Sequence, residues 1–303
     1  MDVLNIKGLK KSFGDKVVLN GLDLCVPEQS IFGFVGRNGA GKTTTMKSVL
    51  GLLKPDDGEI YVCGEKVTYG QTSTNRFVGY LPDVPEFYPF MTAKEYLKLC
   101  GESLNMSSKD IEGRSNELLN LVGLNGERHR IKGYSRGMKQ RLGIAQALLA
   151  SPKLLICDEP TSALDPIGRK DILDILLSVK DQTTVLFSTH ILSDVERICT
   201  EVAVLNEGSL AMQGTVAQLK SEHCSDGFIV EVQNESDASK LVEAFSSVVR
   251  NEDNELRFVG TDDLMFEVMS FISSNKIAVA KIEKQEPSLE ALFMEVVSKC
   301  GLL

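Results

Sequence analysis

The sequence predicts an α/β protein with two domains, a large one built on a mixed sheet with a helical insertion and a small α+β domain. Three features of the chain support this prediction. An apolar run, Ile31–Val35, leads directly into a glycine-rich loop and then into a segment with helical character. Two further apolar runs, 154–157 and 183–190, are too short for buried helices and are typical of strands in a parallel sheet. After about Asp226 the pattern changes to short alternating strands and helices, which indicates a second domain.

The overall composition excludes several classes of protein. The 303 residues suffice for one large domain and one small one, and 43% hydrophobic with 25% charged residues is ordinary for a soluble protein. Apolar stretches stay short of the roughly 20 residues that span a bilayer, and the N-terminus does not resemble a secretory signal. A net charge of −9 argues against a nucleic-acid partner. The seven cysteines form no C-x-x-C pair, which predicts reduced thiols without a disulfide framework or metal site.

The first residues predict an antiparallel β part. Residues 2–7 and 17–26 alternate apolar and polar side chains, the pattern of two half-buried strands. Phe13 is expected in a polar turn between them, where burial gives no evident reason for an aromatic ring. The ring could provide a platform on which a purine base stacks, or it could be a partly buried loop aromatic, and the spacing alone favours neither.

The glycine-rich loop matches the pattern G-x-x-x-x-G-K-T between a strand and a helix, which is typical of a phosphate site. The loop and the start of the helix comprise Gly36, Arg37, Asn38, Gly39, Ala40, Gly41, Lys42, Thr43 and Thr44. Glycines let the backbone N–H groups curl around an anion, and the following helix adds the positive end of its dipole. Lys42 supplies an ammonium group for the phosphates of a nucleoside triphosphate, and Thr43 can ligate Mg²⁺. The alternative, a plain glycine-rich turn, does not explain the Lys-Thr pair.

The middle of the chain, about 84–150, is predicted to be a helical subdomain. A hairpin over 59–67 and a strand over 77–81 precede it. Prolines at 82, 85 and 89 exclude regular structure until Thr92, which can cap a helix together with Glu95 three residues later. Helical patterns then cover 92–100, 108–122 and 137–150.

Two adjacent acids, Asp158 and Glu159, follow the buried strand 154–157. Carboxylates at the end of a buried strand are costly unless a cation pairs with them, and a nucleotide-bound Mg²⁺ would supply that cation. Asp158 can hold the metal, while Glu159 can act as the general base for the attacking water. The alternative is a pair of exposed acids at a strand end, and the phosphate loop upstream argues against it.

His190 ends the next predicted strand, 183–190. A single histidine is usually structural. However, the carboxyl ends of parallel strands line the ligand crevice in such sheets, so His190 is expected near the two acids. A hydrogen-bond donor to the γ-phosphate is therefore the favoured interpretation.

The C-terminal residues predict a small α+β domain over 226–303. Its patterns follow the order βαββαβ, which suggests a ferredoxin-like fold. The expected elements are strands at 228–232 and 277–283, helices at 237–245, 264–272 and 288–300, and two short strands around a turn in between. No catalytic constellation is visible here, so we expect a regulatory or dimer-supporting domain, with a purely structural cap as the alternative.

The order of these motifs resembles the ATP-binding cassette (ABC) family of ATPases. The matching pieces are the Walker A loop at 36–43, a signature segment at 134–138, the Walker B acids at 158–159, the sequence SALD at 162–165, and His190. The resemblance covers residues 1 to about 218, which implies an ATPase domain over 1–220 that binds ATP and Mg²⁺. It also implies that Phe13 is the aromatic residue that stacks on adenine.

Two positions depart from the family pattern. The usual signature LSGGQ is YSRGM here, so Ser135 and Gly137 are retained while Arg136 replaces a glycine and Met138 a glutamine. Asp83 stands where the family has a glutamine after the preceding Leu-Pro. A carboxylate there could still hold water or Mg²⁺, but it cannot donate an amide hydrogen bond.

The resemblance implies a mechanism that needs two subunits. Two such domains meet head to tail, and each ATP lies between the Walker A loop of one copy and the signature of the other. Ser135 and Gly137 would then contact the nucleotide of the second copy, and Asp165 would lie at the seam. The second nucleotide-binding subunit is expected to be another copy of this chain or a close relative.

The segments 134–149 and 288–297 are similar to bacterial ABC ATPases that serve drug, bacitracin or lantibiotic exporters of the ABC-2 kind. The resemblance therefore implies an ATPase that powers a separate integral-membrane permease, as a peripheral protein on the cytoplasmic face of the membrane. The aromatic residues Phe87, Tyr88 and Phe90 are the expected docking face, with local core packing as the alternative. The alternative function is a soluble ABC ATPase acting on ribosomes or DNA, against which a single cassette and the acidic charge argue.

Overall fold

The computed structural model describes residues 2–71, 73–222, 227–245, 248–250, 254–284, 289, 290 and 292. The chain forms two compact units, Met1–Val216 and Ala217–Leu303, compared with the sequence-based bounds 1–220 and 226–303. Helix α7 (Val216–Glu222) begins at the boundary. Among the described residues, no helix is both long and apolar enough to cross a bilayer.

An antiparallel sheet with the order β2-β1-β4-β5 forms one layer of the first unit. Its strands are β1 (Asp2–Phe13), β2 (Lys16–Pro27), β4 (Asp57–Val62) and β5 (Glu65–Lys66). The first strand runs further than the predicted 2–7, because irregularities in its register interrupt the alternation after Ile6. Phe13 is therefore the last residue of β1, which corrects its expected place in the turn.

A six-stranded mixed sheet with the order β10-β9-β3-β8-β7-β6 forms the second layer. Its strands are β3 (Ile31–Val35), β6 (Val78–Leu81), β7 (Leu154–Asp158), β8 (Thr184–Thr189), β9 (Glu201–Asn206) and β10 (Ser209–Thr215). Strands β6, β7, β8, β3 and β9 are parallel, and β10 returns antiparallel to β9. The carboxyl ends of β3, β7 and β8 therefore meet at one edge of the sheet.

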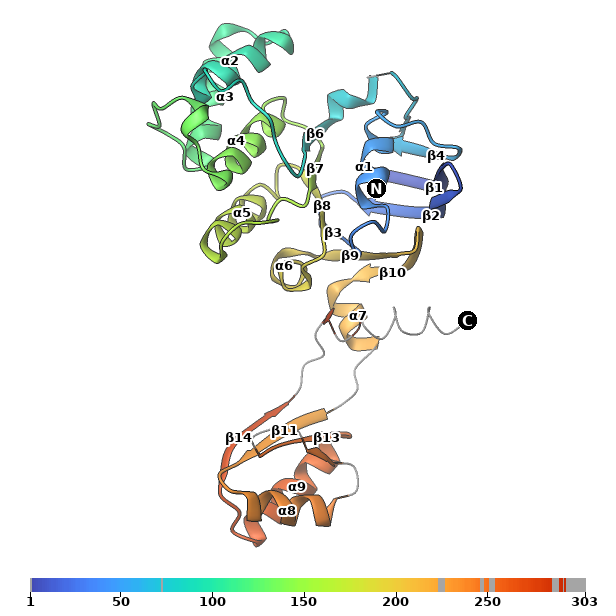
Figure 1. Ribbon diagram of the computed structural model, residues 1–303, viewed down its shortest axis with the longest axis vertical. Helices are drawn as coiled ribbons and strands as arrows, with labels where there is room; N and C mark the ends of the chain where they lie inside the picture. Colours follow the sequence, from blue (N-terminus) through green and yellow to red (C-terminus); the bar gives the residue numbers. More distant parts are fainter. Residues whose placement is uncertain are drawn as a thin grey trace. The chain divides into compact units, whose positions relative to one another are not determined.

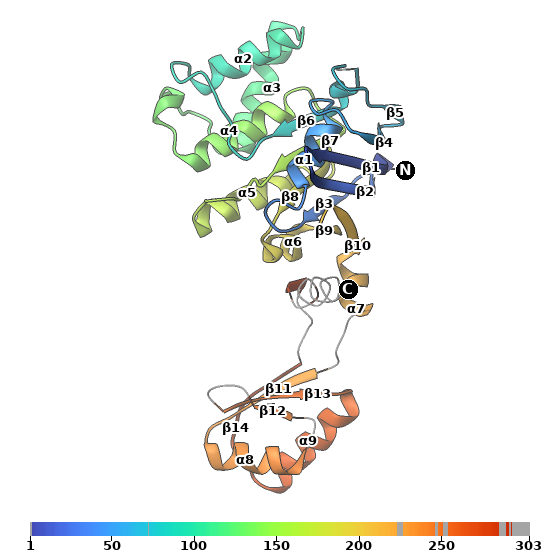
Figure 2. The same ribbon diagram turned by 45° about the vertical axis from the view of Figure 1, so that its right-hand side comes forward.

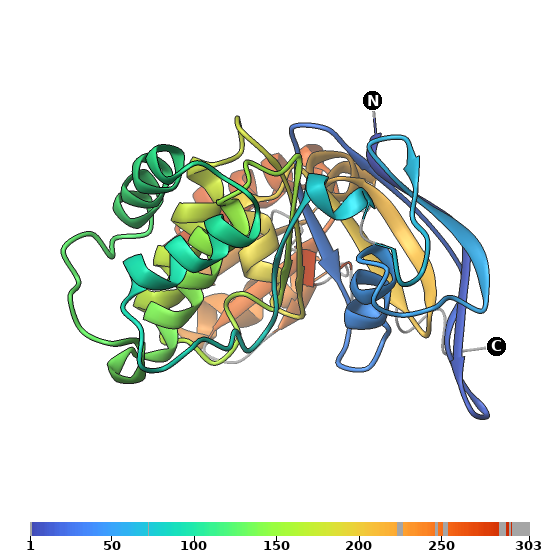
Figure 3. The same ribbon diagram turned by 90° about the horizontal axis from the view of Figure 1, so that it is seen from above.

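Helix α1 (Lys42–Val49) lies between the two sheets, whereas α5 (Pro166–Ser178) and α6 (Leu192–Ile198) lie on the opposite side of the six-stranded sheet (Figures 1 and 3). The core between the sheets is apolar and almost fully buried. It includes Leu4, Ile6, Leu24, Phe32, Phe34, Met46, Leu154 and Ile156. Burying these side chains provides the main free energy that holds the glycine-rich loop and the strand ends in place.

The helical subdomain contains α2 (Ala93–Ser103), α3 (Ser108–Leu121) and α4 (Arg136–Leu148), with the short 3₁₀ helices Ser73–Phe77 and Ile131–Gly133 before α2 and α4. As expected, α2 begins with a capping box of Thr92 and Glu95. Serine caps the two other helices, at Ser107 for α3 and Ser135 for α4. The cap at Ser135 fixes the start of α4 at the segment that resembles the ABC signature.

The second unit has the predicted βαββαβ order and the ferredoxin-like strand order β12-β13-β11-β14 with antiparallel neighbours, which confirms the fold. Its elements are β11 (Gly227–Val232), α8 (Glu235–Ala244), β12 (Val248–Arg250), β13 (Glu255–Val259), α9 (Asp262–Ser274) and β14 (Val279–Lys284). Figure 2 shows both helices on one face of this sheet, around a core that includes Phe228, Leu241 and Val268. Apart from 289, 290 and 292, the predicted helix 288–300 lies outside the described residues.

Candidate nucleotide-binding site

The glycine-rich loop connects β3 to α1 and closes against the neighbouring strands. Gly41, the N-terminal cap of α1, has a φ of 113°, a backbone conformation that residues with a Cβ rarely adopt. A Cβ on Gly41 would lie 2.7 Å from a side-chain carbon of Leu19, and one on Gly36 would lie 2.7 Å from the carbonyl oxygen of Leu205. The close packing explains why the loop needs glycine at both positions.

Lys42 is the cation of the site. Its side chain is only 6% exposed, and its Nζ donates a hydrogen bond of 2.6 Å to the carbonyl oxygen of Gly36. The same nitrogen lies 3.1 Å from Oε1 of Glu159. A buried ammonium group needs such partners, since an isolated charge in the interior is strongly unfavourable. The lysine therefore connects the phosphate loop of β3 with the acid that follows β7.

Asp158 is held by two hydroxyl groups. Its Oδ2 accepts a hydrogen bond of 2.8 Å from Thr43 Oγ1, and its Oδ1 accepts one of 2.7 Å from Ser188 Oγ. The register of the sheet places Asp158 opposite Ser188 on β8. A carboxylate and a hydroxyl at this distance are oxygen donors of the kind that Mg²⁺ uses when it binds between protein and phosphates. The donor set therefore fits a magnesium ion held by Thr43 and Asp158.

Glu159 has a strained backbone and contacts two other side chains. Its φ of 49° lies in the left-handed region, which is unusual for a residue with a side chain and is typical of functional sites. Besides Lys42 at Oε1, its Oε2 lies 2.9 Å from Nδ1 of His190. The backbone N–H of Glu159 donates a hydrogen bond of 3.0 Å to Ser188 Oγ. The histidine at the end of β8 thus directly contacts the expected general base.

A cavity of about 330 Å³ brings most of the expected residues together. Its lining consists of Val18, Asn38, Gly39, Gly41, Lys42, Thr43, Thr44, Asp83, Asp158, Glu159, Ser162 and His190. The lining combines backbone N–H groups, a helix N-terminus and a buried ammonium group with three acidic side chains and a histidine. This combination can hold a polyphosphate with its metal and can activate a water molecule next to it.

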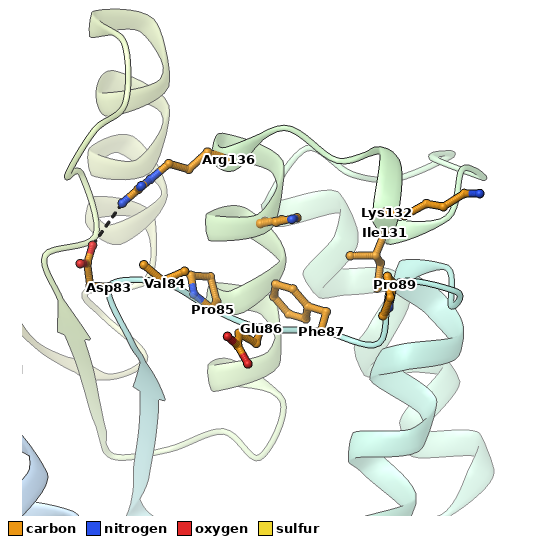
Figure 4. Close-up of a pocket in the computed structure, with 10 residues that line it drawn as sticks. Asp83, Val84, Pro85, Glu86, Phe87, Pro89, Ile131, Lys132 and Arg136 are labelled. Atoms are coloured by element: carbon orange, nitrogen blue, oxygen red, sulfur yellow. Dashed lines mark hydrogen bonds and ion pairs between the residues drawn. The ribbon is translucent and has the colours of Figure 1, made fainter.

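Asp83 follows β6 at the rim of this cavity and is linked to α4. Its backbone oxygen accepts a hydrogen bond of 2.7 Å from Nε2 of Gln140, and its carboxylate lies 3.2 Å from Nη2 of Arg136 (Figure 4). Burial raises the pKa of the Asp83 carboxyl above its ordinary value; Arg136 opposes that shift, and the charges of Asp158 and Glu159 add to it. The carboxylate therefore lies within the electrostatic field of both Asp158 and Glu159.

Seven of the expected nucleotide-binding residues lie outside the lining of this cavity: Gly36, Arg37 and Ala40 of the phosphate loop, and Phe13, Ser135, Gly137 and Asp165 from other parts of the chain. Ser135 accepts a hydrogen bond from the N–H of Met138 as the cap of α4, and Gly137 follows it in the first turn. Asp165 caps α5 and is exposed, and Phe13 is 51% exposed at the end of β1. Ser135, Asp165 and Phe13 thus present a hydroxyl, a carboxylate and an aromatic ring to solvent.

The sequence reasoning missed Ser188, which bonds to both acids of the site. A serine inside an apolar strand is the available signal, because a buried hydroxyl needs a partner. Of the three aromatic residues before α2, Phe87 packs edge-on against Tyr96 with ring centres 5.0 Å apart. Tyr88 and Phe90 are 53% and 59% exposed. Local packing thus explains Phe87, while the other two rings remain at the surface.

Comparisons with known proteins agree with this geometry. A family model described as "ABC transporter" matches residues 19–162, and one described as "ATP-binding protein DrrA1-3-like, C-terminal domain" matches 214–297. The chain is 36% identical to the uncharacterized ABC transporter ATP-binding protein YxlF of Bacillus subtilis, over 97% of this chain and 99% of that protein. It is 34% identical to the bacitracin transport ATP-binding protein BcrA of Bacillus licheniformis, over 97% of both chains.

Solved structures show the same likeness. One titled "Structure of ATP binding subunit of ABC transporter" is 32% identical, with a TM-score of 0.65 over 73% of this chain and 92% of that chain. A second, a dimeric ATP-binding cassette in a post-hydrolysis state bound to ADP and Pi, is 25% identical, with a TM-score of 0.62 over 70% of this chain and 98% of that one.

Proposed function

The chain belongs to the family of ABC transporter ATP-binding proteins, and from this premise we propose that it drives a separate integral-membrane permease that exports drug-type or peptide-type substrates. ATP hydrolysis coupled to transport is the activity of this family. The observation that carries the proposal is the likeness to bacitracin transport ATP-binding proteins. It extends over 97% of both chains for the Bacillus licheniformis protein, and therefore includes the ferredoxin-like unit as well as the ATPase unit. The chain would act as a peripheral protein on the cytoplasmic face of the membrane.

The proposed working unit is a head-to-tail pair of nucleotide-binding subunits. The phosphate loop, the two acids and His190 line one cavity, whereas Ser135, Gly137 and Asp165 lie outside it. A second copy, or a close relative, would bring its own Ser135 and Gly137 to the phosphates held by the first. The exposed N-terminus of α4 suits this task, because its first turn carries no acid and its free N–H groups attract anions.

The phosphate loop and the polar residues around it have separate roles in the proposed reaction. The loop backbone and Lys42 bind the phosphates, and Thr43 with Asp158 would hold Mg²⁺, which neutralises charge on the phosphates when bound. Glu159 takes the proton of the water that attacks the γ-phosphate, giving ADP and inorganic phosphate. His190 orients Glu159 through their contact of 2.9 Å and can donate to the γ-phosphate. Ser188 holds Asp158 and Glu159 in place through hydrogen bonds to the carboxylate of Asp158 and the backbone N–H of Glu159.

The experiment that tests this proposal is capture of the tagged chain from its native cells. Detergent-solubilised membranes and the soluble fraction are processed in parallel, and the co-purified proteins are identified by mass spectrometry. We expect one multi-span membrane protein in the membrane fraction, and vesicles containing both proteins should move a bacitracin-like peptide only when ATP is present. Recovery with ribosomes or DNA and without a membrane protein would favour the soluble alternative and contradict the exporter.

A further inference from the structure

The two positions at which this chain departs from the family pattern contact each other. Asp83 replaces a glutamine at the end of β6, and Arg136 replaces a glycine in the first turn of α4. Their side chains form an ion pair of 3.2 Å across 53 residues of sequence. Figure 4 shows Arg136 extending from α4 toward Asp83. The two replacements therefore belong together, because the ion pair needs both the carboxylate of Asp83 and the guanidinium group of Arg136.

The backbone on both sides of this pair is fixed, whereas the pair itself is accessible. Gln140, which is fully buried on α4, holds the backbone of Asp83 through its hydrogen bond of 2.7 Å. The side chains of Asp83 and Arg136 are 47% and 43% exposed. An ion pair this exposed contributes little to stability, so the guanidinium group can leave Asp83 while α4 and β6 stay in contact.

Arg136 also lies where an anion would be bound. It is placed between Ser135, the cap of α4, and Gly137, and its charge adds to the positive end of the helix dipole. The groove that Arg136 lines also contains Lys132, Lys139 and Glu86, so its other charges are of both signs, and Arg136 is the cation at the first helical position of α4. A guanidinium group keeps its charge and can form two parallel hydrogen bonds to either a carboxylate or a phosphate. A terminal phosphate carries more negative charge than the Asp83 carboxylate, which makes it the stronger partner.

We propose that Arg136 is a phosphate-binding residue for the nucleotide held by the second subunit, and that Asp83 is its counter-ion in the separate subunit. When two subunits close on ATP, Arg136 exchanges the Asp83 carboxylate for the terminal phosphate of the opposing nucleotide. Exclusion of water from the closed interface strengthens the new contact. The inference rests on the proposed head-to-tail pair and adds to it a cation that the family's glycine cannot supply.

The test measures ATP-driven dimerisation in a Glu159→Gln background, in which hydrolysis is slow. Analytical ultracentrifugation over a range of ATP concentrations gives the concentration at half-maximal dimer for each variant. We expect Arg136→Gln to raise the ATP concentration at half-maximal dimer by about tenfold or more, which corresponds to about 1.4 kcal/mol. Arg136→Lys keeps a positive charge and should raise this concentration by less. Lys139→Gln is the matched control, because it removes one positive charge from the same groove and should change the value by less than about twofold.

A second variant separates phosphate binding from a structural link between β6 and α4. Asp83→Asn breaks the ion pair but keeps the cation. Because Asp83 also lines the nucleotide cavity, the ATP affinity of the separate subunit is titrated for this variant and its parent, and dimerisation is compared at equal nucleotide occupancy. The proposal then predicts dimers at an equal or lower ATP concentration. If Asp83→Asn and Arg136→Gln lose dimerisation equally, the pair is structural and the proposal is wrong. The same conclusion follows if Arg136→Gln behaves like its parent, or if Lys139→Gln is impaired as strongly. A parent protein that forms no dimer with ATP would overturn the head-to-tail arrangement and, with it, this inference.

Discussion

Replacing Ser188 by alanine is the most informative change in the site, because one hydroxyl bonds to both Asp158 and Glu159. Ser188 Oγ donates to Asp158 Oδ1 at 2.7 Å and accepts from the N–H of Glu159 at 3.0 Å, and the serine is fully buried. A hydrogen bond to a charged group contributes about 1.5–3 kcal/mol, and a buried N–H left without an acceptor costs about 1–3 kcal/mol. We therefore expect Ser188→Ala to lower the free energy of unfolding by about 3 kcal/mol or more.

The expected effect on catalysis is a loss of turnover rather than of nucleotide affinity. The phosphate loop and Lys42 do not contact Ser188 through any hydrogen bond found among the described residues, so ATP should bind nearly as well as before. Glu159 loses its backbone restraint, and a displacement of a catalytic group by about 1 Å can reduce the rate by about 10²-fold. Steady-state ATPase kinetics with a separate nucleotide-binding titration resolve the two effects.

Thermal unfolding completes the assay. A loss of about 3 kcal/mol lowers the melting temperature of a domain of this size by roughly 6–12 °C. The matched control is Ser193→Ala, which removes the same hydroxyl from an exposed position near the start of α6 and should change stability by less than about 0.5 kcal/mol. If Ser188→Ala and Ser193→Ala have the same melting temperature and turnover, the assigned role of Ser188 is refuted.

Further predictions concern the charged residues of the site and the thiols of two cysteines. Glu159→Gln should slow ATP hydrolysis by roughly 10²–10⁴-fold with ATP affinity unchanged, and normal turnover would remove Glu159 as the base. Lys42→Ala should weaken nucleotide binding by at least about tenfold, since Lys42 is the only lysine or arginine among the described residues that line the cavity; an unchanged dissociation constant would contradict this. Burial raises the pKa of the thiols of Cys157 and Cys199, so at pH 8 both stay protonated. Mass spectrometry after brief alkylation of the native chain should find them unmodified, while exposed Cys25 reacts.

The residues that follow buried strands could be placed from the sequence because the sheet leaves few alternatives. The carboxyl ends of parallel strands meet at one edge, so the glycine-rich loop, Asp158 and His190 had to lie close together once β3, β7 and β8 were neighbours. The start of α2 was equally predictable, since the prolines before Thr92 and the capping box define it.

Other features depend on contacts that no local pattern encodes. Ser188 and Asp158 are 30 positions apart in the sequence, and the register between β7 and β8 brings them together. The ion pair of Asp83 with Arg136 follows from the packing of β6 against α4. The extension of β1 to Phe13 was missed because irregular register hides the alternation that identifies a strand. Such long-range pairings are decided by tertiary packing and not by propensity.

A structure of the Glu159→Gln protein with ATP and Mg²⁺ would decide whether a second subunit completes the nucleotide site. We expect two subunits arranged head to tail, with the phosphates of each nucleotide between the 36–43 loop of one subunit and Ser135 and Gly137 of the other. A nucleotide-bound structure in which the segment 135–137 faces bulk water, with no second subunit placed to bring it to a terminal phosphate, would contradict the head-to-tail pair.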